Sequence, residues 1–287
     1  MKIGFIGLGL MGEAMSLNLV KKSGHPVRVF DLDAAKVALL VEAGAEAAAS
    51  IREVGETCDV VVSMVPKSEH VQAVYRELLP VARAGQVLID MSTIDVAVSV
   101  ELSEQVAKTG AVMLDAPVVK SVPAAKDGTL GIYVGGDAAS FERVRDILAC
   151  MGCNIIHLGA NGRGLVMKLA HNVLVAEIQN GVNEMLTAAH EFGISTEDFA
   201  TAVSYGGASN FYLTSKLNAL KAEDYTTAFS LENMGKDIDC MVRMVEPKGL
   251  KLPGVLNCQS VYNFAIDNGM GREDFCASIK SVKLRAH

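Results

Sequence analysis

The stretch Gly7-Leu8-Gly9-Leu10-Met11-Gly12 follows the apolar run Ile3-Gly4-Phe5-Ile6 and precedes apolar residues at helical spacing. Strand, glycine turn and helix in this order predict a dinucleotide-binding unit, with all six turn residues at the cofactor. The first glycine takes a conformation that a Cβ would strain, the second lets a pyrophosphate approach, and the third lets the helix pack on the strand. The helix N-terminus would face the phosphates. Taken alone, the motif also fits a glycine-rich turn that binds nothing.

An acidic residue ends the second predicted strand. Val27-Arg28-Val29-Phe30 is followed by Asp31, about 20 residues beyond the last glycine of the turn. A carboxylate there accepts hydrogen bonds from both ribose hydroxyls of NAD. Neither Leu32 nor Asp33 is basic, and the carboxylate would repel the 2′-phosphate of NADP. We therefore expect NAD as the cofactor rather than NADP.

Length and charge limit the class of protein. The chain has 287 residues, half of them hydrophobic, which suits about two globular domains. A formal net charge of −7 argues against nucleic-acid binding, which needs clustered Lys and Arg. No apolar stretch reaches the roughly 20 residues that span a bilayer, and Gly9, Gly12 and Glu13 interrupt the run that imitates an export signal. We expect no membrane partner and no export.

The cysteines favour a reducing compartment. All six are scattered through predicted core segments without a secreted disulfide pattern, so we expect the cytoplasm. Cys150 and Cys153 are the one close pair. A redox or zinc role for them would need a thioredoxin-like strand before the pair or a second ligand pair, and the sequence contains neither. We expect no metal site.

The pattern of elements changes near residue 162. Before it, short β-branched runs alternate with helical segments, which is typical of a parallel sheet wrapped by helices. The strand runs lie at 3–6, 27–30, 60–64, 87–89, 112–114, 132–134 and 155–156. After Gly162-Arg163-Gly164, a predicted hinge, a long helix is expected from Leu165 to about Phe192, and only helical segments follow. The prediction is an α/β fold: a Rossmann-type doubly wound domain over 1–161 and an all-helical domain over 162–287.

Loops at the carboxyl ends of the predicted strands carry candidate binding residues, because parallel sheets bind ligands at this edge. Three of these residues, in two loops, are expected to lie at the nicotinamide half of the cofactor: Val65, Pro66 and Thr93. Three more, in the loop after residue 117, would bind an anionic group on the substrate: Val119, Lys120 and Ser121. Ordinary loops and a solvent-facing lysine are the alternatives.

The long helix carries the candidate catalytic residue. Lys168 lies one turn into this helix among apolar neighbours, and Asn172 follows four residues later on the same face. Reduction of a carbonyl requires a proton at the oxygen, and an ammonium group supplies both that proton and electrostatic stabilisation. We expect Lys168 to act as general acid and base, while Asn172 binds the substrate. A surface lysine whose stem packs on apolar neighbours is the alternative.

Four motifs in this order resemble those of the β-hydroxyacid dehydrogenases over essentially the whole chain. They are the segment Gly4–Gly12, the loop from Asp115, Gly162-x-Gly164-x3-Lys168-x3-Asn172, and Phe229 followed by Lys236-Asp237. The resemblance implies that Lys168 is catalytic, that Asn172 binds substrate, and that Thr93 and Lys236 contact NAD. It also implies a homodimer or a homotetramer.

The chain departs from the family pattern at two places. The family's Asp-x-Pro-Val-Ser-Gly-Gly reads Asp115-Ala116-Pro117-Val118-Val119-Lys120-Ser121, and an Asn of the catalytic helix is His171. Two glycines have become a cation and a hydroxyl, which favours a sulfonate or a second carboxylate on the substrate. The candidate substrates are 3-sulfolactaldehyde, succinic semialdehyde and 3-hydroxyisobutyrate. The alternatives are an imine reductase, which usually lacks the lysine, and a non-catalytic NAD-binding scaffold.

Overall fold

The computed structural model describes residues 1–286 and divides the chain into two compact units after Lys168. This division lies inside the long helix α8, Arg163–Glu191, whereas the sequence places the domain boundary before Gly162. The difference has a simple cause: Leu165, in the first turn of α8, is fully buried in the core of the first unit. The start of this helix is therefore part of the sheet domain.

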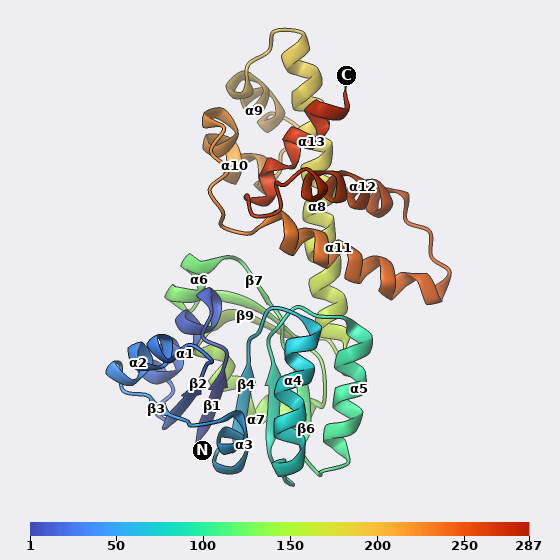
Figure 1. The fold of residues 1–287 in the computed structure, drawn as a ribbon. Coiled ribbons are helices and arrows are strands. Elements are labelled where there is room, and N and C mark those ends of the chain that lie inside the picture. The colour runs from blue at the N-terminus through green and yellow to red at the C-terminus, as the bar shows by residue number, and fades with distance from the viewer. Residues whose placement is uncertain (287) are drawn as a thin grey trace. The chain divides into compact units, whose positions relative to one another are not determined.

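The first unit contains a six-stranded parallel sheet in the order β3-β2-β1-β4-β5-β6 (Figure 1). The strands are β1 (Ile3–Ile6), β2 (Val27–Phe30), β3 (Glu46–Ala47), β4 (Val60–Ser63), β5 (Val87–Asp90) and β6 (Val112–Asp115). The chain builds outward from β1 on one side and then resumes beside it with β4. In such sheets the strand order reverses where ligands bind, here at the carboxyl ends of β1 and β4.

Both faces of this sheet are covered, which is why its strands are apolar at successive positions. One face packs on α1 (Leu10–Lys22), α2 (Ala34–Glu42) and α7 (Ala138–Ala149). The other packs on α3 (Ile51–Thr57), α4 (Ser68–Leu78) and α5 (Val96–Ala107), with η1 (Leu79–Val81) after α4. Within β1, Phe5 belongs to the first core and Ile6 to the second. The Rossmann-type prediction is confirmed.

The strands beyond β6 form a second sheet. Its order is β7 (Val118–Val119), β8 (Leu130–Val134) and β9 (Gly152–His157), with β7 antiparallel to β8, and α6 (Val122–Asp127) follows β7. The prediction that 132–134 and 155–156 continue one parallel sheet is wrong. The chain turns back after β6 at Pro117, which has no amide hydrogen to donate to a ladder, and Asp115 pairs with Gly135 in an antiparallel bridge.

The second unit is helical, as predicted. After α8 come α9 (Thr196–Ser204), α10 (Phe211–Ala222), α11 (Leu231–Val245), η2 (Glu246–Lys248), α12 (Pro253–Asp267), η3 (Phe275–Ala277) and α13 (Ser278–Arg285). Polar side chains fix several starts: Ser195, Asn210 and Ser230 each accept a hydrogen bond from an amide of the first turn of their helix. The sequence did not predict α13.

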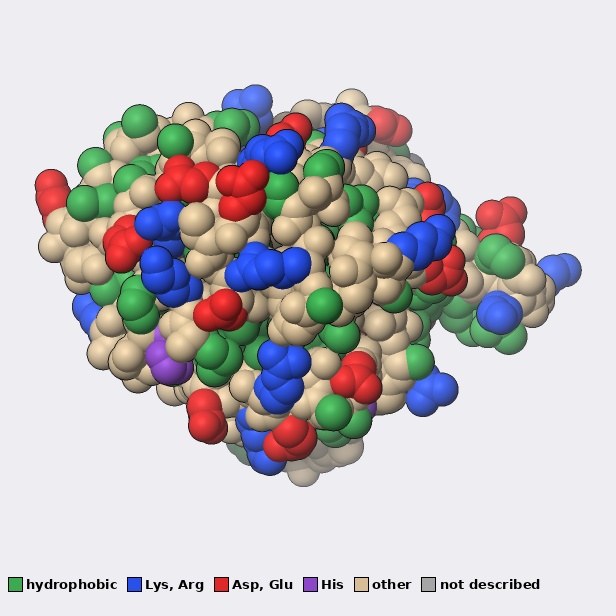
Figure 2. Space-filling view, turned by 90° about the horizontal axis from the view of Figure 1, so that it is seen from below, with side chains coloured by type: hydrophobic (Ala, Val, Ile, Leu, Met, Phe, Trp, Pro, Cys, Tyr) green, Lys and Arg blue, Asp and Glu red, His purple; other side chains and the backbone are tan. Residues whose placement is uncertain are grey.

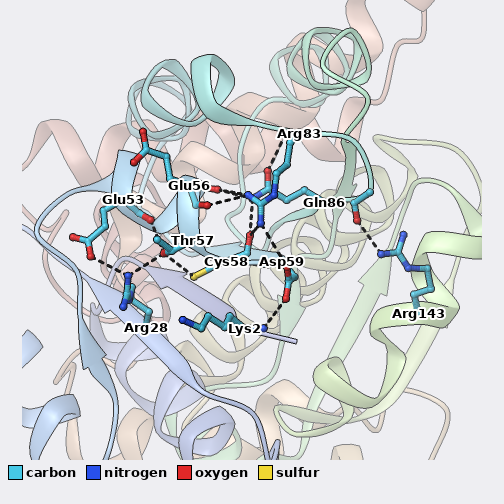
Figure 3. Close-up of polar contacts among 12 residues, drawn as sticks. Lys2, Arg28, Glu53, Glu56, Thr57, Cys58, Asp59, Arg83, Gln86 and Arg143 are labelled. Atoms are coloured by element: carbon cyan, nitrogen blue, oxygen red, sulfur yellow. Dashed lines mark hydrogen bonds and ion pairs between the residues drawn. The ribbon is translucent and has the colours of Figure 1, made fainter.

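The amino ends of the strands are closed by a polar network that has a structural role (Figure 3). Gln86, just before β5, donates 2.8 Å hydrogen bonds to the carbonyl oxygens of Gly55 and Cys58, and Arg83 donates to the same two oxygens. The amide of Lys2 donates to Asp59 at 2.9 Å. These bonds satisfy main-chain groups at one edge of the sheet and leave the carboxyl edge for ligands.

The charged side chains are interspersed on the face shown in Figure 2. Lysine and arginine alternate there with aspartate and glutamate, and no large patch of a single sign forms. Within residues 1–286, no helix combines the length and apolar character needed to cross a membrane.

Candidate active site

The glycine turn has the geometry that a dinucleotide requires. Gly7 has a φ of +94°, and a Cβ added there would lie 2.3 Å from the carbonyl oxygen of Met64. A Cβ at Gly12 would lie 2.0 Å from the carbonyl oxygen of Gly7, so α1 packs tightly against the turn. A Cβ at Gly9 would meet no atom within 4 Å, and no side chain caps the helix at this residue. Open space therefore lies before the amides of α1.

Asp31 lies beside the turn, as the sequence predicts for an acid at the end of β2. One carboxylate oxygen accepts a 2.5 Å hydrogen bond from the amide of Leu8, and the other accepts one of 2.8 Å from the amide of Asp33. These hydrogen bonds hold the carboxylate of Asp31 directly against the glycine turn. Together with the space before α1, these residues fit NAD, whose phosphates would lie on the helix amides and whose ribose would reach the acid.

Two more loops at this edge are tied to the turn. The amide of Met64 donates to the carbonyl of Ile6 at 2.9 Å, and the amide of Met91 donates to the carbonyl of Ser63 at 2.8 Å. The hydroxyl of Ser92 accepts a 2.9 Å hydrogen bond from the amide of Val65. Val65, Pro66 and Thr93, the predicted nicotinamide-side residues, therefore lie in two loops that hold each other. Their contact with the cofactor stays a prediction.

A buried carboxylate lies beneath these loops. Asp90 ends β5 and is 1% exposed, and its Oδ1 accepts hydrogen bonds from the hydroxyls of Ser63 (2.8 Å) and Ser92 (2.7 Å). Burial raises the pKa of this carboxyl to about 6, against the opposing effect of the serine donors. The sequence places Asp90 at the start of the loop that contains Thr93, on the expected nicotinamide side, but it assigns Asp90 no role of its own.

A second buried carboxylate holds the start of α8. Asp115 ends β6 and accepts hydrogen bonds from the amides of Gly162, at 2.7 Å, and Leu165, at 2.9 Å. Burial raises its pKa, and these amides oppose the shift. A Cβ on Gly164 would lie 2.8 Å from the carboxylate, so the helix approaches it closely. Asp115 thereby fixes the turn of helix that carries Lys168.

Lys168 is buried, with 9% of its surface exposed, which excludes the alternative of a lysine on the open surface. It belongs to the first unit, and Asn172, one helical turn later, belongs to the second. An ammonium group removed from water interacts strongly with the few groups around it. This environment suits a residue that holds or delivers a proton.

The loop after Pro117, which the sequence predicts to bind an anionic group of the substrate, contains an unusual lysine. Lys120 has a φ of +80°, a left-handed conformation that strongly favours glycine, and the family pattern has glycine there. Its ammonium donates a 2.6 Å hydrogen bond to the carbonyl of Thr129. Val119 pairs with Gly131 on β8, and Ser121 precedes α6. The predicted role of these three residues in binding an anionic group is not tested by this geometry.

In the second unit, Asp237 joins two predicted site residues. Asn172 donates a 2.6 Å hydrogen bond to its Oδ2, and the ammonium of Lys236 lies 3.3 Å from its Oδ1. Asp237 and Asn172 are buried. The carboxylate orients the amide of Asn172 and neutralises Lys236 locally. Sequence analysis quoted Asp237 only as the neighbour of Lys236, because the pairing with α8 spans 65 residues of sequence.

Both units match known families. Residues 2–159 match the family described as the NAD binding domain of 6-phosphogluconate dehydrogenase. Residues 162–282 match the family described as NAD-binding of NADP-dependent 3-hydroxyisobutyrate dehydrogenase. The two matches divide the chain near the start of α8.

Similar proteins align with the whole chain. The 2-hydroxy-3-oxopropionate reductase of Escherichia coli is 32% identical, with 100% of this chain and 99% of that protein covered. The NAD-dependent L-serine dehydrogenase of Pseudomonas aeruginosa is 33% identical over 96% of this chain and 95% of that protein. A structure of Mycobacterium tuberculosis 3-hydroxyisobutyrate dehydrogenase with L-serine superposes with a TM-score of 0.91, 31% identity, and 98% and 99% coverage.

Proposed function

The chain belongs to the β-hydroxyacid dehydrogenase family, and from this premise we propose that it interconverts a small anionic β-hydroxyacid, or a hydroxysulfonate, and its semialdehyde with NAD. One observation carries the proposal. The buried Lys168 lies on α8, whose start is fixed by Asp115 in the same unit as a complete glycine turn with its acid.

Lys168 acts as the general acid and base. When bound, NAD supplies the hydride chemistry. In the reducing direction, the ammonium of Lys168 gives a proton to the carbonyl oxygen of the substrate, and in the oxidising direction the amine takes the proton of the hydroxyl. The positive charge also stabilises negative charge that develops on that oxygen.

Two further residues with proposed roles, Asn172 and Lys236, belong to the second unit. Asn172 binds the substrate through its amide, which Asp237 orients by a 2.6 Å hydrogen bond. Lys236 contacts NAD, and its pairing with Asp237 restricts the directions that its ammonium can take. Thr93, Val65 and Pro66 line the nicotinamide side in the first unit.

The anionic group of the substrate binds at Val119, Lys120 and Ser121. The positive φ of Lys120 supports this role, because a strained residue persists where function requires its side chain. To bind substrate, the ammonium exchanges the carbonyl of Thr129 for the anion. Candidate substrates are 3-sulfolactaldehyde, succinic semialdehyde and 3-hydroxyisobutyrate.

The acid at the end of β2 supports NAD over NADP. Asp31 is held at the turn by the amide of Leu8, where its charge opposes a 2′-phosphate. The Pseudomonas aeruginosa relative is an NAD-dependent enzyme.

A homodimer or homotetramer in the cytoplasm completes the proposal. Helix α8 carries an exposed stripe on one face, made of Leu174, Ile178, Gly181 and Met185, and the exposed Phe192 follows directly after the helix. Such a stripe on a helix favours burial against another subunit. All six cysteines are free thiols, which suits a reducing compartment.

A substrate panel tests the proposal. Purified protein is assayed with NADH and NADPH against 3-sulfolactaldehyde, succinic semialdehyde and methylmalonate semialdehyde, and with NAD against the corresponding alcohols, by absorbance of the reduced nicotinamide. We expect turnover with NADH and a preference for the substrate with the stronger anionic group. Binding of NADH without any turnover would instead indicate a scaffold, and turnover of cyclic imines alone would indicate an imine reductase.

A further inference from the structure

The hydroxyl of Ser92 joins two loops of the first unit, and the buried carboxylate of Asp90 accepts the hydrogen bond that this hydroxyl donates. We propose that Asp90 is a positioning residue for NAD: in its ionised form it holds Ser92, and Ser92 holds the main chain of Val65 in the loop after β4. This inference rests on the proposed use of NAD. It adds a residue that contacts neither substrate nor cofactor.

The hydrogen bonds form a continuous chain. Oδ1 of Asp90 accepts 2.7 Å and 3.4 Å hydrogen bonds from the hydroxyl and the amide of Ser92. The hydroxyl of Ser92 in turn accepts the amide hydrogen of Val65 at 2.9 Å. The preceding residue, Met64, lies against the glycine turn, because a Cβ on Gly7 would be 2.3 Å from its carbonyl oxygen. A change at Asp90 therefore alters the position of the main chain at Val65 and Met64, next to the glycine turn.

Stability alone does not account for a carboxylate at this position. Within residues 1–286, Oδ2 of Asp90 is buried and accepts no hydrogen bond, although a carboxylate has acceptor sites on both oxygens. Such a group is costly to remove from water. Its charge strengthens the hydrogen bonds that the two serine hydroxyls donate to Oδ1, since bonds to ionised acceptors are stronger than neutral ones. The charge thus acts through Oδ1, where it strengthens the hydrogen bond that holds Ser92 and, through Ser92, the loop after β4.

The groups that face Asp90 explain why it titrates in an accessible range. Asp115 on β6 raises the pKa of Asp90 by repulsion, the buried hydroxyl of Tyr75 on α4 is close enough to interact with it electrostatically, and Ser63 and Ser92 donate hydrogen bonds to it. Burial is the largest cause, and the pKa is about 6. Protonation below this pH weakens the bonds from the serines and loosens the loop.

The test measures NAD binding directly, without turnover. The dissociation constant for NAD is determined by titration calorimetry from pH 5 to pH 8 for the parent protein and three variants: Asp90→Asn, Ser92→Ala and Ser63→Ala. Asp90→Asn mimics the protonated acid. Ser92→Ala keeps the carboxylate but removes the link to Val65. Ser63→Ala is the matched control, since it removes a 2.8 Å hydrogen bond to the same oxygen, close to the 2.7 Å of Ser92, but does not remove the hydrogen bond to the amide of Val65.

The expected NAD affinities distinguish a positioning role of Asp90 from a role in packing alone. The parent binds NAD about threefold to tenfold more weakly below pH 6 than at pH 8, as charge-assisted bonds give way to neutral ones. Asp90→Asn binds NAD at every pH as weakly as the parent does below pH 6. At pH 8, Ser92→Ala binds NAD as weakly as Asp90→Asn does. A fourth variant that combines Asp90→Asn with Ser92→Ala binds NAD no more weakly than either single variant, because both substitutions break the same chain of hydrogen bonds. Ser63→Ala keeps the parent affinity at pH 8, with its pH midpoint shifted upward.

Two results overturn the inference, and they have different meanings. If the parent binds NAD but Asp90→Asn and Ser92→Ala bind it equally well at pH 8, the role of Asp90 is wrong while the proposed function stands. If the parent does not bind NAD, both fail. Thermal unfolding of each variant verifies folding, and Ser92→Ala alone decides the outcome if Asp90→Asn does not fold.

Discussion

The carboxylate of Asp115 accepts a 2.9 Å hydrogen bond from the amide of Leu165, three residues before Lys168. The same carboxylate accepts the amide hydrogen of Gly162 at 2.7 Å. Asp115 ends β6, so the sheet holds the helix that carries the proposed acid and base. The position of the amine is thereby fixed from outside its own helix.

Replacing Asp115 by Asn is expected to lower kcat by about 10-fold to 100-fold, since a small misplacement of a catalytic group is costly. The new amide presents donors toward main-chain donors. NAD affinity stays unchanged, because the glycine turn and Asp31 are held by other bonds. Steady-state kinetics and calorimetry with NAD measure both quantities. An unaltered kcat would remove the positioning role of Asp115.

Replacing Lys168 by Met is expected to lower kcat by roughly 10²-fold to 10⁴-fold, because a general acid is lost from the reaction. NAD binding should change little. Lys108→Met is the matched control, since Lys108 is an exposed lysine of the same unit at the end of α5. If the Lys168 variant retained the parent rate, the proposed acid and base would be wrong.

Lys120→Gly should both stabilise the protein and alter its substrate preference. Removing the Cβ at a φ of +80° relieves left-handed strain, and the free energy of unfolding should rise by up to ~1 kcal/mol after the added unfolded-state entropy. Lys120→Ala, the companion variant, keeps the strain and removes only the ammonium. Both variants should lose preference for a sulfonate or dicarboxylate substrate. An unchanged ranking of substrates in both would eliminate the head-group role.

Asp31→Ala should narrow the preference for NAD over NADP. The variant loses the hydrogen bond from Leu8 and the charge that repels a 2′-phosphate, so KM for NAD rises and KM for NADP falls. Asp33→Ala serves as the control. It removes the cap of α2 and should cost about 1 kcal/mol of stability while leaving the KM ratio intact. Equal KM ratios in Asp31→Ala and the parent would contradict the assignment.

The buried acid Asp90 should make the protein less stable as pH rises from about 4 to about 6. Its folded pKa of about 6 exceeds the ordinary value of 3.8, so the native state binds the proton more tightly than the unfolded state. Stability from this group is present at low pH, is lost through that window and is constant above it. The shift corresponds to roughly 3 kcal/mol at neutral pH.

Denaturant unfolding at pH 4 to 8 measures this loss against Asp90→Asn. The difference in unfolding free energy, parent minus variant, should decline across the window and then stay flat. A difference that rises with pH would mean that Asp90 is stabilised in its charged form and would reverse the sign of the shift.

Much of the cofactor half was predictable from the sequence, because its features are local. The turn Gly7–Gly12 needs particular residues within six positions, and Asp31 follows its own strand directly. The regular spacing of apolar residues along the chain indicates helices, and the second unit was correctly predicted to be helical. The second sheet was missed, since a two-residue strand such as β7 has no periodicity to detect.

The sequence by itself determined the fold class, the glycine turn with its acid, and the helix that carries Lys168 and Asn172. Only the tertiary structure decided which groups hold these residues: Asp115 for the start of α8, Asp237 for Asn172, and Asp90 for the loops. The first two of these hydrogen bonds join residues 47 and 65 positions apart. The raised pKa of Asp90 depends on its burial and on neighbours from other strands. Local sequence fixes backbone conformation within a few residues, whereas burial and long-range hydrogen bonds exist only after the chain has folded.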